Sequence, residues 1–269
     1  MNKISLLGVG FTQGSEKRIL EEVMEKVENS TVSFYIVTPN PEMIVAAQSD
    51  VEFRKALNNA EVALADGVGV TVGAALLGKQ GISRITGVDF MESLCKQAAE
   101  KGVSIGFLGG GDGVAERTSE CLKKKYPGLK VVFVASEWSE SGFVNAQAVK
   151  DERVKSKEDG IISHKSPNRK QTIDLLFVAF GFPKQEFWMA KHIGKLPVKM
   201  MMGVGGAFDY LSGDVSRAPK YMRDLGLEWL FRLVSQPWRI KRQIALPKFI
   251  LLVLGSMVKK LVSLKKSYF

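Results

Sequence analysis

The stretch VSIGFLGGGDGVAERTSECLKKK, residues 103–125, decides the fold class of this chain. Its first six residues are almost all apolar, which is typical of a buried strand. A glycine-rich turn follows at 109–113, and the remainder has the apolar spacing of a helix. An apolar strand that passes through a glycine turn into a helix is the repeating unit of a parallel sheet covered on both faces.

Similar units recur along the chain. Further strands are predicted at residues 34–37, 61–65, 129–134, 173–180 and 198–202. The apolar run 4–11 predicts a first strand rather than a signal peptide, because it contains glycines and lacks a small-residue cleavage site. After strand 34–37, Asn40 fits the N-cap of a helix and Pro41 its first position. We therefore predict an α/β fold with mainly parallel, Rossmann-like sheets, helices on both faces and a helical C-terminal appendage.

The net charge of +10 resides in the last 55 residues. Residues 215–269 contain 12 Lys and Arg against two acids, whereas residues 1–214 contain 26 of each sign. The longest apolar run near the C-terminus, 249–254, is well short of the roughly 20 residues that span a bilayer. We predict a catalytic α/β domain at 1–214 and, at 215–269, a basic and apolar appendage that associates with an anionic membrane surface.

The tail allows other partners too. It could pack its apolar face on another copy of the chain, so a homo-oligomer stays open, whereas its apolar content argues against nucleic-acid binding. The two cysteines, Cys95 and Cys121, form no CxxC pair or disulfide framework, which favours a reducing compartment. We expect a cytoplasmic protein that is attached peripherally to the inner face of the cell membrane.

Polar and glycine-rich clusters follow the predicted strands, at the edge where parallel sheets bind ligands. Asp66 could accept a proton from a substrate hydroxyl, although an Asp-Gly pair taken alone more often makes a turn. Gly109 and Gly110 could cradle a phosphate or form a tight turn, and Gly205 in the loop 203–206 has the same two interpretations. Asp209 could bond a base or sugar, or cap the next helix.

Three tail arginines suit a diphosphate. Arg232, Arg239 and Arg242 are spaced seven and three apart, which places them on one helical face if the helix tolerates Pro237. Guanidinium forks bind phosphate oxygens in pairs. The Asp-x-Asp motif, with which nucleotide-sugar enzymes commonly hold a divalent metal, does not occur in the chain. We therefore expect neither a metal nor a cofactor, and expect arginines or helix N-termini to stabilise a departing diphosphate.

Eight motifs in order resemble the WecG/TagA/CpsF family of bacterial glycosyltransferases, over nearly the whole chain. They are TPN at 38–40, ADG at 65–67, RITGVD at 84–89, PKQE at 183–186, GVGGAFD at 203–209, RAP at 217–219, LEW at 227–229 and PWRIKR at 237–242. The resemblance implies an inverting, metal-independent transfer of N-acetylmannosamine from a UDP donor. The acceptor would be N-acetylglucosamine linked through diphosphate to a polyprenyl lipid, in the synthesis of a surface polymer such as wall teichoic acid.

The resemblance also implies roles for single residues. Asp66 would be the catalytic base, Thr38, Arg84 and Gln185 would line the site, and the three tail arginines would belong to an appendage that closes over it at the membrane. The segment 183–186 taken alone is better explained as ordinary first-turn capping of a helix. Together with the strand-end positions, these matches give the predicted substrate-binding residues: Thr38, Asn40, Arg84, Gly109, Gly110, Gln185, Gly205 and Asp209. Arg232, Arg239 and Arg242 are predicted to hold the lipid diphosphate or the leaving group.

Three alternatives stay open. The donor could be a different UDP-sugar, carrying N-acetylmannosaminuronic acid or glucose, and the polar stretch 139–170 lacks the helical pattern expected in this family, which indicates an altered loop. A nicotinamide oxidoreductase is disfavoured because Val114 breaks the GxGxxG pattern. A peripheral membrane scaffold that binds phospholipid without catalysis would bind no UDP.

Overall fold

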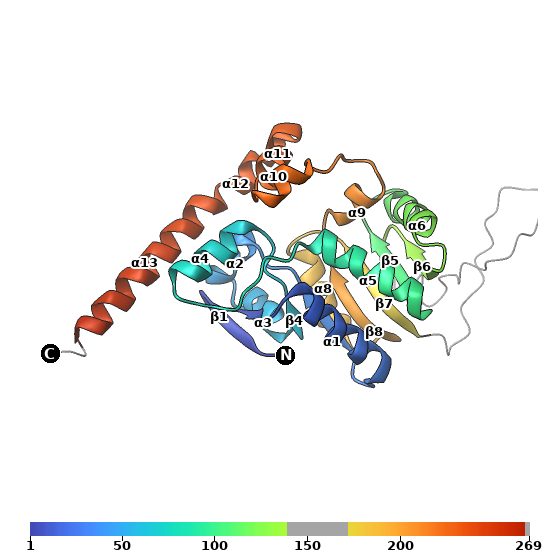
Figure 1. The fold of residues 1–269 in the computed structure, drawn as a ribbon, viewed down its shortest axis with the longest axis horizontal. Coiled ribbons are helices and arrows are strands. Elements are labelled where there is room, and N and C mark those ends of the chain that lie inside the picture. The colour runs from blue at the N-terminus through green and yellow to red at the C-terminus, as the bar shows by residue number, and fades with distance from the viewer. Residues whose placement is uncertain (139–171, 267–269) are drawn as a thin grey trace, which may run out of the picture. The chain divides into compact units, whose positions relative to one another are not determined.

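The computed structural model describes residues 1–138 and 172–266 and has an α/β fold (Figure 1). A six-stranded sheet has the strand order β4-β3-β8-β7-β5-β6, and a separate two-stranded sheet is formed by β1 and β2. The predicted fold class is confirmed. The stretch 139–170, for which we predict an altered loop, lies outside the described residues.

The chain divides into two compact units. The first contains residues 1–21, 36–90 and 216–269, and the second contains residues 22–35 and 91–215. The tail therefore belongs to the same unit as the N-terminal elements, and the chain enters it within one residue of the domain boundary predicted after residue 214. That division into a catalytic domain and an appendage stays a prediction.

The sheet is apolar through its centre. Its strands are β3 (Phe34–Val37), β4 (Val62–Ala63), β5 (Ser104–Gly109), β6 (Lys130–Ala135), β7 (Ile173–Ala179) and β8 (Val198–Gly203). In the second unit, β5 pairs with β7 and β7 with β8, all parallel, and Phe107, Phe177 and Met202 lie side by side in register. All three side chains are fully buried. Continuous apolar runs predicted these strands because both faces of the sheet are covered.

The prediction of one strand at 4–11 is wrong. Residues Lys3–Leu6 and Val9–Thr12 form the antiparallel hairpin of β1 and β2. Leu7 and Gly8 make the turn, with φ angles of 52° and 83°. This two-residue turn has positive φ at both positions, a conformation that glycine adopts readily and leucine does not. The unfavourable leucine explains why the turn is hard to see in the sequence.

Two helices of the first unit begin at the capping side chains of Asn40 and Asp50. Asn40 caps α2 (Pro41–Ser49), where its side-chain oxygen accepts the N–H of Met43 at 3.0 Å, as predicted. The other helices before the tail are α1 (Glu16–Asn29), α3 (Val51–Asn59), α4 (Val68–Leu76) and α5 (Gly87–Lys101), of which α1 and α5 continue into the second unit. The second unit adds α6 (Val114–Lys125), α8 (Lys184–His192) and α9 (Ala207–Leu211).

The tail is helical but broken. Its elements are α10 (Lys220–Asp224), α11 (Glu228–Ser235), the short 3-10 helix η1 (Pro237–Arg239), α12 (Ile240–Gln243) and α13 (Ala245–Lys266). Proline lacks an N–H and its ring clashes with the preceding turn, so α11 ends before Pro237. Arg232, Arg239 and Arg242 consequently lie on three separate helices, so the condition for one shared helical face, a helix that tolerates Pro237, is not met.

The long helix α13 packs against α4 and α2 of its own unit (Figure 1). Phe249 and Val253 are each only 3% exposed. A side chain on Gly73 of α4 would place its Cβ 2.8 Å from the ring of Phe249, so the absence of a side chain permits the close approach. Within residues 1–138 and 172–266, none of the helices combines the length and the apolar character that crossing a bilayer requires.

Candidate active site

Three segments of the first unit meet at Asp66. The residues after β3 are joined to those after β4 by the bond from the N–H of Asp66 to the carbonyl of Pro39, at 3.2 Å. The loop that leads into α5 joins from the other side, where the N–H of Ile85 donates to the carbonyl of Ala65 at 3.0 Å. Backbone bonds therefore fix the motifs 38–40, 65–67 and 84–89 around one carboxylate.

The pKa of Asp66 lies above the ordinary value of an aspartate side chain. Burial is the main cause, and it raises the pKa of this half-buried side chain to about 6. The N–H of Gly87 bonds to the carboxylate and opposes the rise, as does the charge of Arg84, whereas Glu228 and Asp89 add to it. At neutral pH the group is ionised yet basic enough to accept a proton, as a general base requires.

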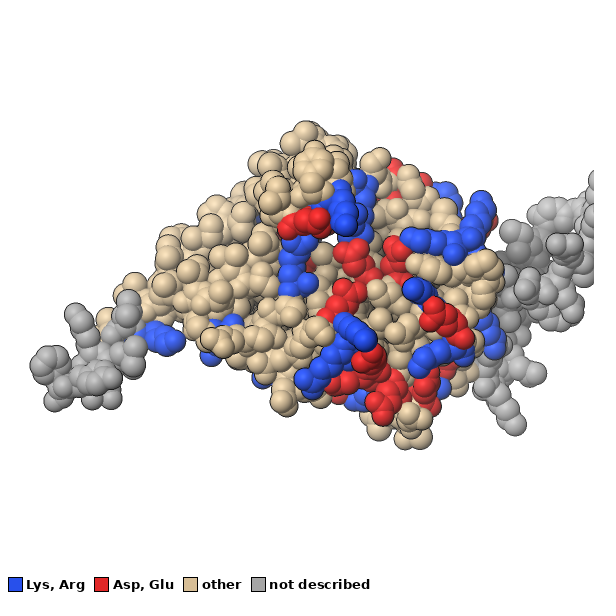
Figure 2. Space-filling view, viewed as in Figure 1, with Lys and Arg blue, Asp and Glu red and all other residues tan. Residues whose placement is uncertain are grey.

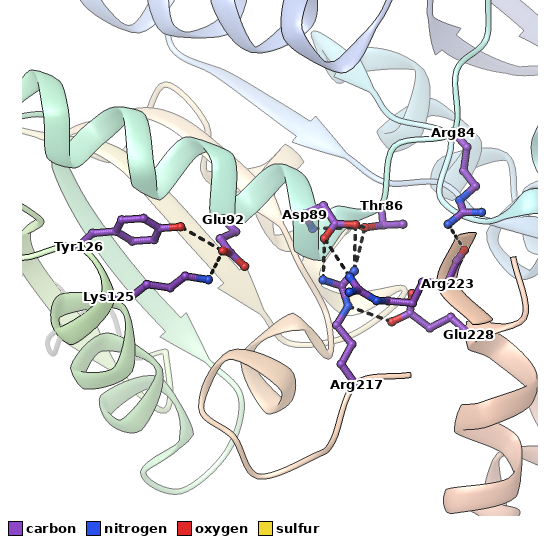
Figure 3. Close-up of polar contacts among 9 residues, drawn as sticks. All are labelled: Arg84, Thr86, Asp89, Glu92, Lys125, Tyr126, Arg217, Arg223 and Glu228. Atoms are coloured by element: carbon purple, nitrogen blue, oxygen red, sulfur yellow. Dashed lines mark hydrogen bonds and ion pairs between the residues drawn. The ribbon is translucent and has the colours of Figure 1, made fainter. Parts of the chain in front are cut away.

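The structure places Thr38 and Arg84 close to this carboxylate. Thr38 is buried, and its side chain packs against Gly87, where a Cβ would lie 3.2 Å from the Thr38 methyl group. Arg84 donates through Nη2 to the carbonyl of Arg223 at 2.6 Å, which ties it to the end of α10 (Figure 3). Asn40 uses its side-chain oxygen as the cap of α2.

A network of charged side chains surrounds the start of α5 (Figure 3). Thr86 and Asp89 form a cap: the Thr86 hydroxyl donates to Asp89 Oδ2 at 2.6 Å and accepts the N–H of Asp89 at 3.2 Å. Arg217 donates hydrogen bonds to the same carboxylate through both Nη atoms, at 2.6 and 2.9 Å. Its Nε donates to Glu228 at 3.2 Å. One guanidinium thus joins the loop before α5 to the start of α11.

The segment 184–186 forms a second polar cluster, in the second unit. Gln185 accepts the N–H of Gly205 at 3.0 Å, and its amide nitrogen donates to Glu186 at 2.8 Å. Both side chains are buried, and Pro183, the N-cap of α8, makes no side-chain cap hydrogen bond. A Cβ on Gly203 would lie 2.9 Å from the Gln185 amide nitrogen. Burial raises the pKa of Glu186 to about 7, and the second carboxylate oxygen has no hydrogen-bond partner in the described structure.

Packing accounts for Gly109 and Gly110 at the end of β5. Both have positive φ, and a Cβ on Gly109 would lie 2.9 Å from the backbone of Ala179. The N–H of Gly110 already donates to the carbonyl of Ala179 at 3.0 Å, so that group is not directed at a ligand. Asp209 is half-buried in the first turn of α9, whose N-cap is Gly206. Substrate contacts from these three residues stay predictions.

The three tail arginines differ in their surroundings. Arg242 makes a two-pronged ion pair with Glu42 in the first turn of α2, with Nη2 2.6 Å and Nε 3.0 Å from the same oxygen. Arg232 is half-buried in α11, and the side chain of Arg239 lies outside the described residues. The described part of the chain brings no three His, Cys, Asp or Glu side chains together as a metal site would require. Metal independence stays a prediction.

Sequence reasoning missed Asp89, Arg217 and Glu228 as members of the site, although each belongs to a motif quoted above. The only local signal was the Thr-x-x-Asp spacing of 86–89, which marks a helix cap. The pairing with Arg217 crosses 128 positions, and no periodicity encodes it.

Known proteins resemble this chain over most of its length. The family model "Glycosyl transferase WecG/TagA/CpsF family" matches residues 4–262. A protein of Bacillus spizizenii strain W23 is 34% identical over 82% of this chain and 78% of its own length. One of Staphylococcus aureus strain MRSA252 is 30% identical over 92% and 90%. Both are named N-acetylglucosaminyldiphosphoundecaprenol N-acetyl-beta-D-mannosaminyltransferase. The chain belongs to the WecG/TagA/CpsF family of glycosyl transferases.

Proposed function

We propose that this glycosyltransferase moves N-acetylmannosamine from a UDP donor to N-acetylglucosamine carried on undecaprenyl diphosphate. The names of the relatives support the transferred sugar and the acceptor. The observation that carries the chemistry is Asp66, a half-buried carboxylate with a pKa of about 6, whose backbone is held by the carbonyl of Pro39 and whose neighbour Ala65 is bonded to Ile85 in the segment before α5.

The proposed step is a single displacement. Asp66 takes the proton of the acceptor hydroxyl while that oxygen attacks the anomeric carbon of the donor sugar. The bond between this carbon and the β-phosphate oxygen breaks, and UDP leaves with the electron pair. One base and no covalent sugar intermediate invert the configuration at the anomeric carbon.

Guanidinium groups take the place of a metal in this proposal. Negative charge grows on the leaving diphosphate, and positive groups aimed at it lower the barrier. Arg84 lies nearest to Asp66 in this role, and Arg232, Arg239 and Arg242 are the candidates from the tail. Arg242 would exchange its partner Glu42 for a phosphate oxygen when substrate binds.

Helix α13 is proposed to dock on the anionic membrane that holds the lipid acceptor. Its outward positions Leu251, Leu254, Val258 and Val262 recur at helical spacing and are 48–68% exposed. Figure 2 shows a largely uncharged surface in the region of α13 and α4. Lys248 and Lys259 are exposed on the same helix and can contact anionic headgroups, at about 1 kcal/mol each. In this proposal the protein is attached peripherally to the inner face of the membrane.

A reconstituted assay tests the proposal. Purified full-length protein is mixed with a lipid-diphosphate-linked N-acetylglucosamine acceptor and a panel of UDP-sugars, with and without a chelator. We expect a β-linked disaccharide from UDP-N-acetylmannosamine and an unchanged rate with chelator. Product only from UDP-N-acetylmannosaminuronic acid or UDP-glucose would reassign the donor. Binding of phospholipid without binding of UDP would support the scaffold instead.

A further inference from the structure

Arg217 bonds the start of α5, the residue before it and the start of α11 with one guanidinium. We propose that Arg217 is a positioning residue for sugar transfer, which keeps the 84–89 loop and the carboxylates beside it in the arrangement that Asp66 needs. The inference rests on the proposed function of Asp66 as the base. Arg217 itself does not contact Asp66 in this account.

The contacts of Arg217 use the whole guanidinium. Two nitrogens bind the two oxygens of Asp89, Nη2 also lies 3.4 Å from the Thr86 hydroxyl, and Nε binds Glu228. The side chains of Arg217 and Glu228 are 20% and 21% exposed, so water screens this ion pair only in part. A planar fork with donors on three sides is a geometry that lysine cannot reproduce.

These contacts are connected to Asp66 through Gly87 and Ile85. Thr86 and Asp89 flank Gly87, and the N–H of Gly87 bonds to the Asp66 carboxylate. Ile85 in the same loop donates to the carbonyl of Ala65, the neighbour of Asp66. By fixing the cap of α5, Arg217 therefore fixes the donor that stabilises the ionised base.

Arg217 also neutralises the charges that oppose that base. The charged groups facing Asp66 are Arg84, Asp89 and Glu228, and both carboxylates raise its pKa. Asp89 lies 3.9 Å from a second guanidinium, that of Arg223, whereas Glu228 forms its ion pair with Arg217. Without the charge of Arg217, both carboxylates would act more strongly on Asp66, and the base would be protonated at a higher pH.

The test compares Arg217→Gln, Glu228→Gln and the double variant with the wild type. The first readout is the acid limb of kcat/KM against pH, and the second is the titration of the Asp66 side-chain carboxyl by carbon NMR, without substrate. The signal is assigned by its loss in Asp66→Asn. Arg117→Gln is the matched control, because Arg117 makes a similar two-pronged pair with Asp214 in the second unit.

We expect Arg217→Gln to shift the acid limb of kcat/KM and the NMR titration midpoint of Asp66 to a pH about 1 unit higher. At pH 6 this shift alone lowers the rate about fivefold, and above pH 8 it lowers the rate hardly at all. Glu228→Gln should move both readouts downward, and the double variant should return them toward the wild type. Arg117→Gln should leave both unchanged.

Folded Arg217→Gln and Glu228→Gln proteins whose Asp66 titrates at the wild-type pH would overturn the inference. If Arg217→Gln does not fold, Glu228→Gln and Arg217→Lys decide, with Lys expected to give a smaller upward shift because it keeps the charge and loses the fork. The NMR readout separates the two proposals. A wild type that transfers no sugar would refute the function, whereas an active wild type with an unmoved titration would refute only the role of Arg217.

Discussion

The packing of α13 gives a prediction whose size follows from the structure. Phe249 is 3% exposed, and its ring fills the space left by Gly73. Replacing a buried phenylalanine with alanine in a core typically costs about 3–5 kcal/mol. Because α13 is the last helix of the described chain, Phe249→Ala should loosen this helix while the rest of the unit stays folded.

Hydrogen exchange of the α13 amides measures this loosening. A loss of 3–5 kcal/mol raises the opening equilibrium by about 10²- to 10⁴-fold, up to the limit set by the total docking free energy. Gly73→Val should act in the same direction, since its Cβ would lie 2.8 Å from the Phe249 ring. The unfolding of the sheet, followed by peptides from β5 and β7, should change little.

Leu251→Ala is the matched control on the opposite side of the helix, where the side chain is 68% exposed. We expect wild-type exchange in this variant, together with weaker binding to anionic vesicles because apolar area is lost from the proposed membrane face. Wild-type exchange in Phe249→Ala, or an equal effect of Leu251→Ala, would refute the packing argument.

Two further predictions concern buried carboxylates, and in both the sign is set by a pKa that is higher in the folded state. The pKa of Glu186 is about 7 instead of 4.5, so ionisation of this side chain destabilises the folded protein as pH rises through this range. Glu186→Gln should therefore stabilise the fold by up to about 3 kcal/mol at pH 8 and by little at pH 4. Asp66→Asn should do the same over the window from about pH 4 to 6, again by up to about 3 kcal/mol. Urea unfolding of each variant across pH checks both, and a stability difference independent of pH would contradict the raised pKa values.

Much of the fold could be predicted from the sequence because the sheet is buried on both faces. Mainly apolar runs mark β5, β7 and β8, and the Asn-Pro pair at 40–41 marks the start of α2. The N-terminal hairpin was missed because Leu7 occupies a turn position that normally selects Asn or Gly. The sequence left open whether a tail helix tolerates Pro237, and the structure ends α11 before this proline.

The site could be predicted only where local spacing carries information. Asp66 follows a strand and precedes a glycine, which a parallel sheet places at its ligand edge. Arg217 and Asp89 were missed because their contact depends on how distant segments fold together. The basic tail was assigned wholly to outside partners, yet Arg217, Arg242 and Lys260 make contacts within their own unit, the last with the carbonyl of Leu77 at the end of α4.

The rate of sugar transfer by Asp66→Asn is the most direct test of the central claim, that one carboxylate activates the acceptor hydroxyl. It should be measured at pH 8, where the wild-type group is ionised, beside calorimetry with the UDP-sugar. We predict that transfer falls by about 10²- to 10⁴-fold while donor binding is nearly unchanged. Transfer at the wild-type rate by this variant would contradict the account.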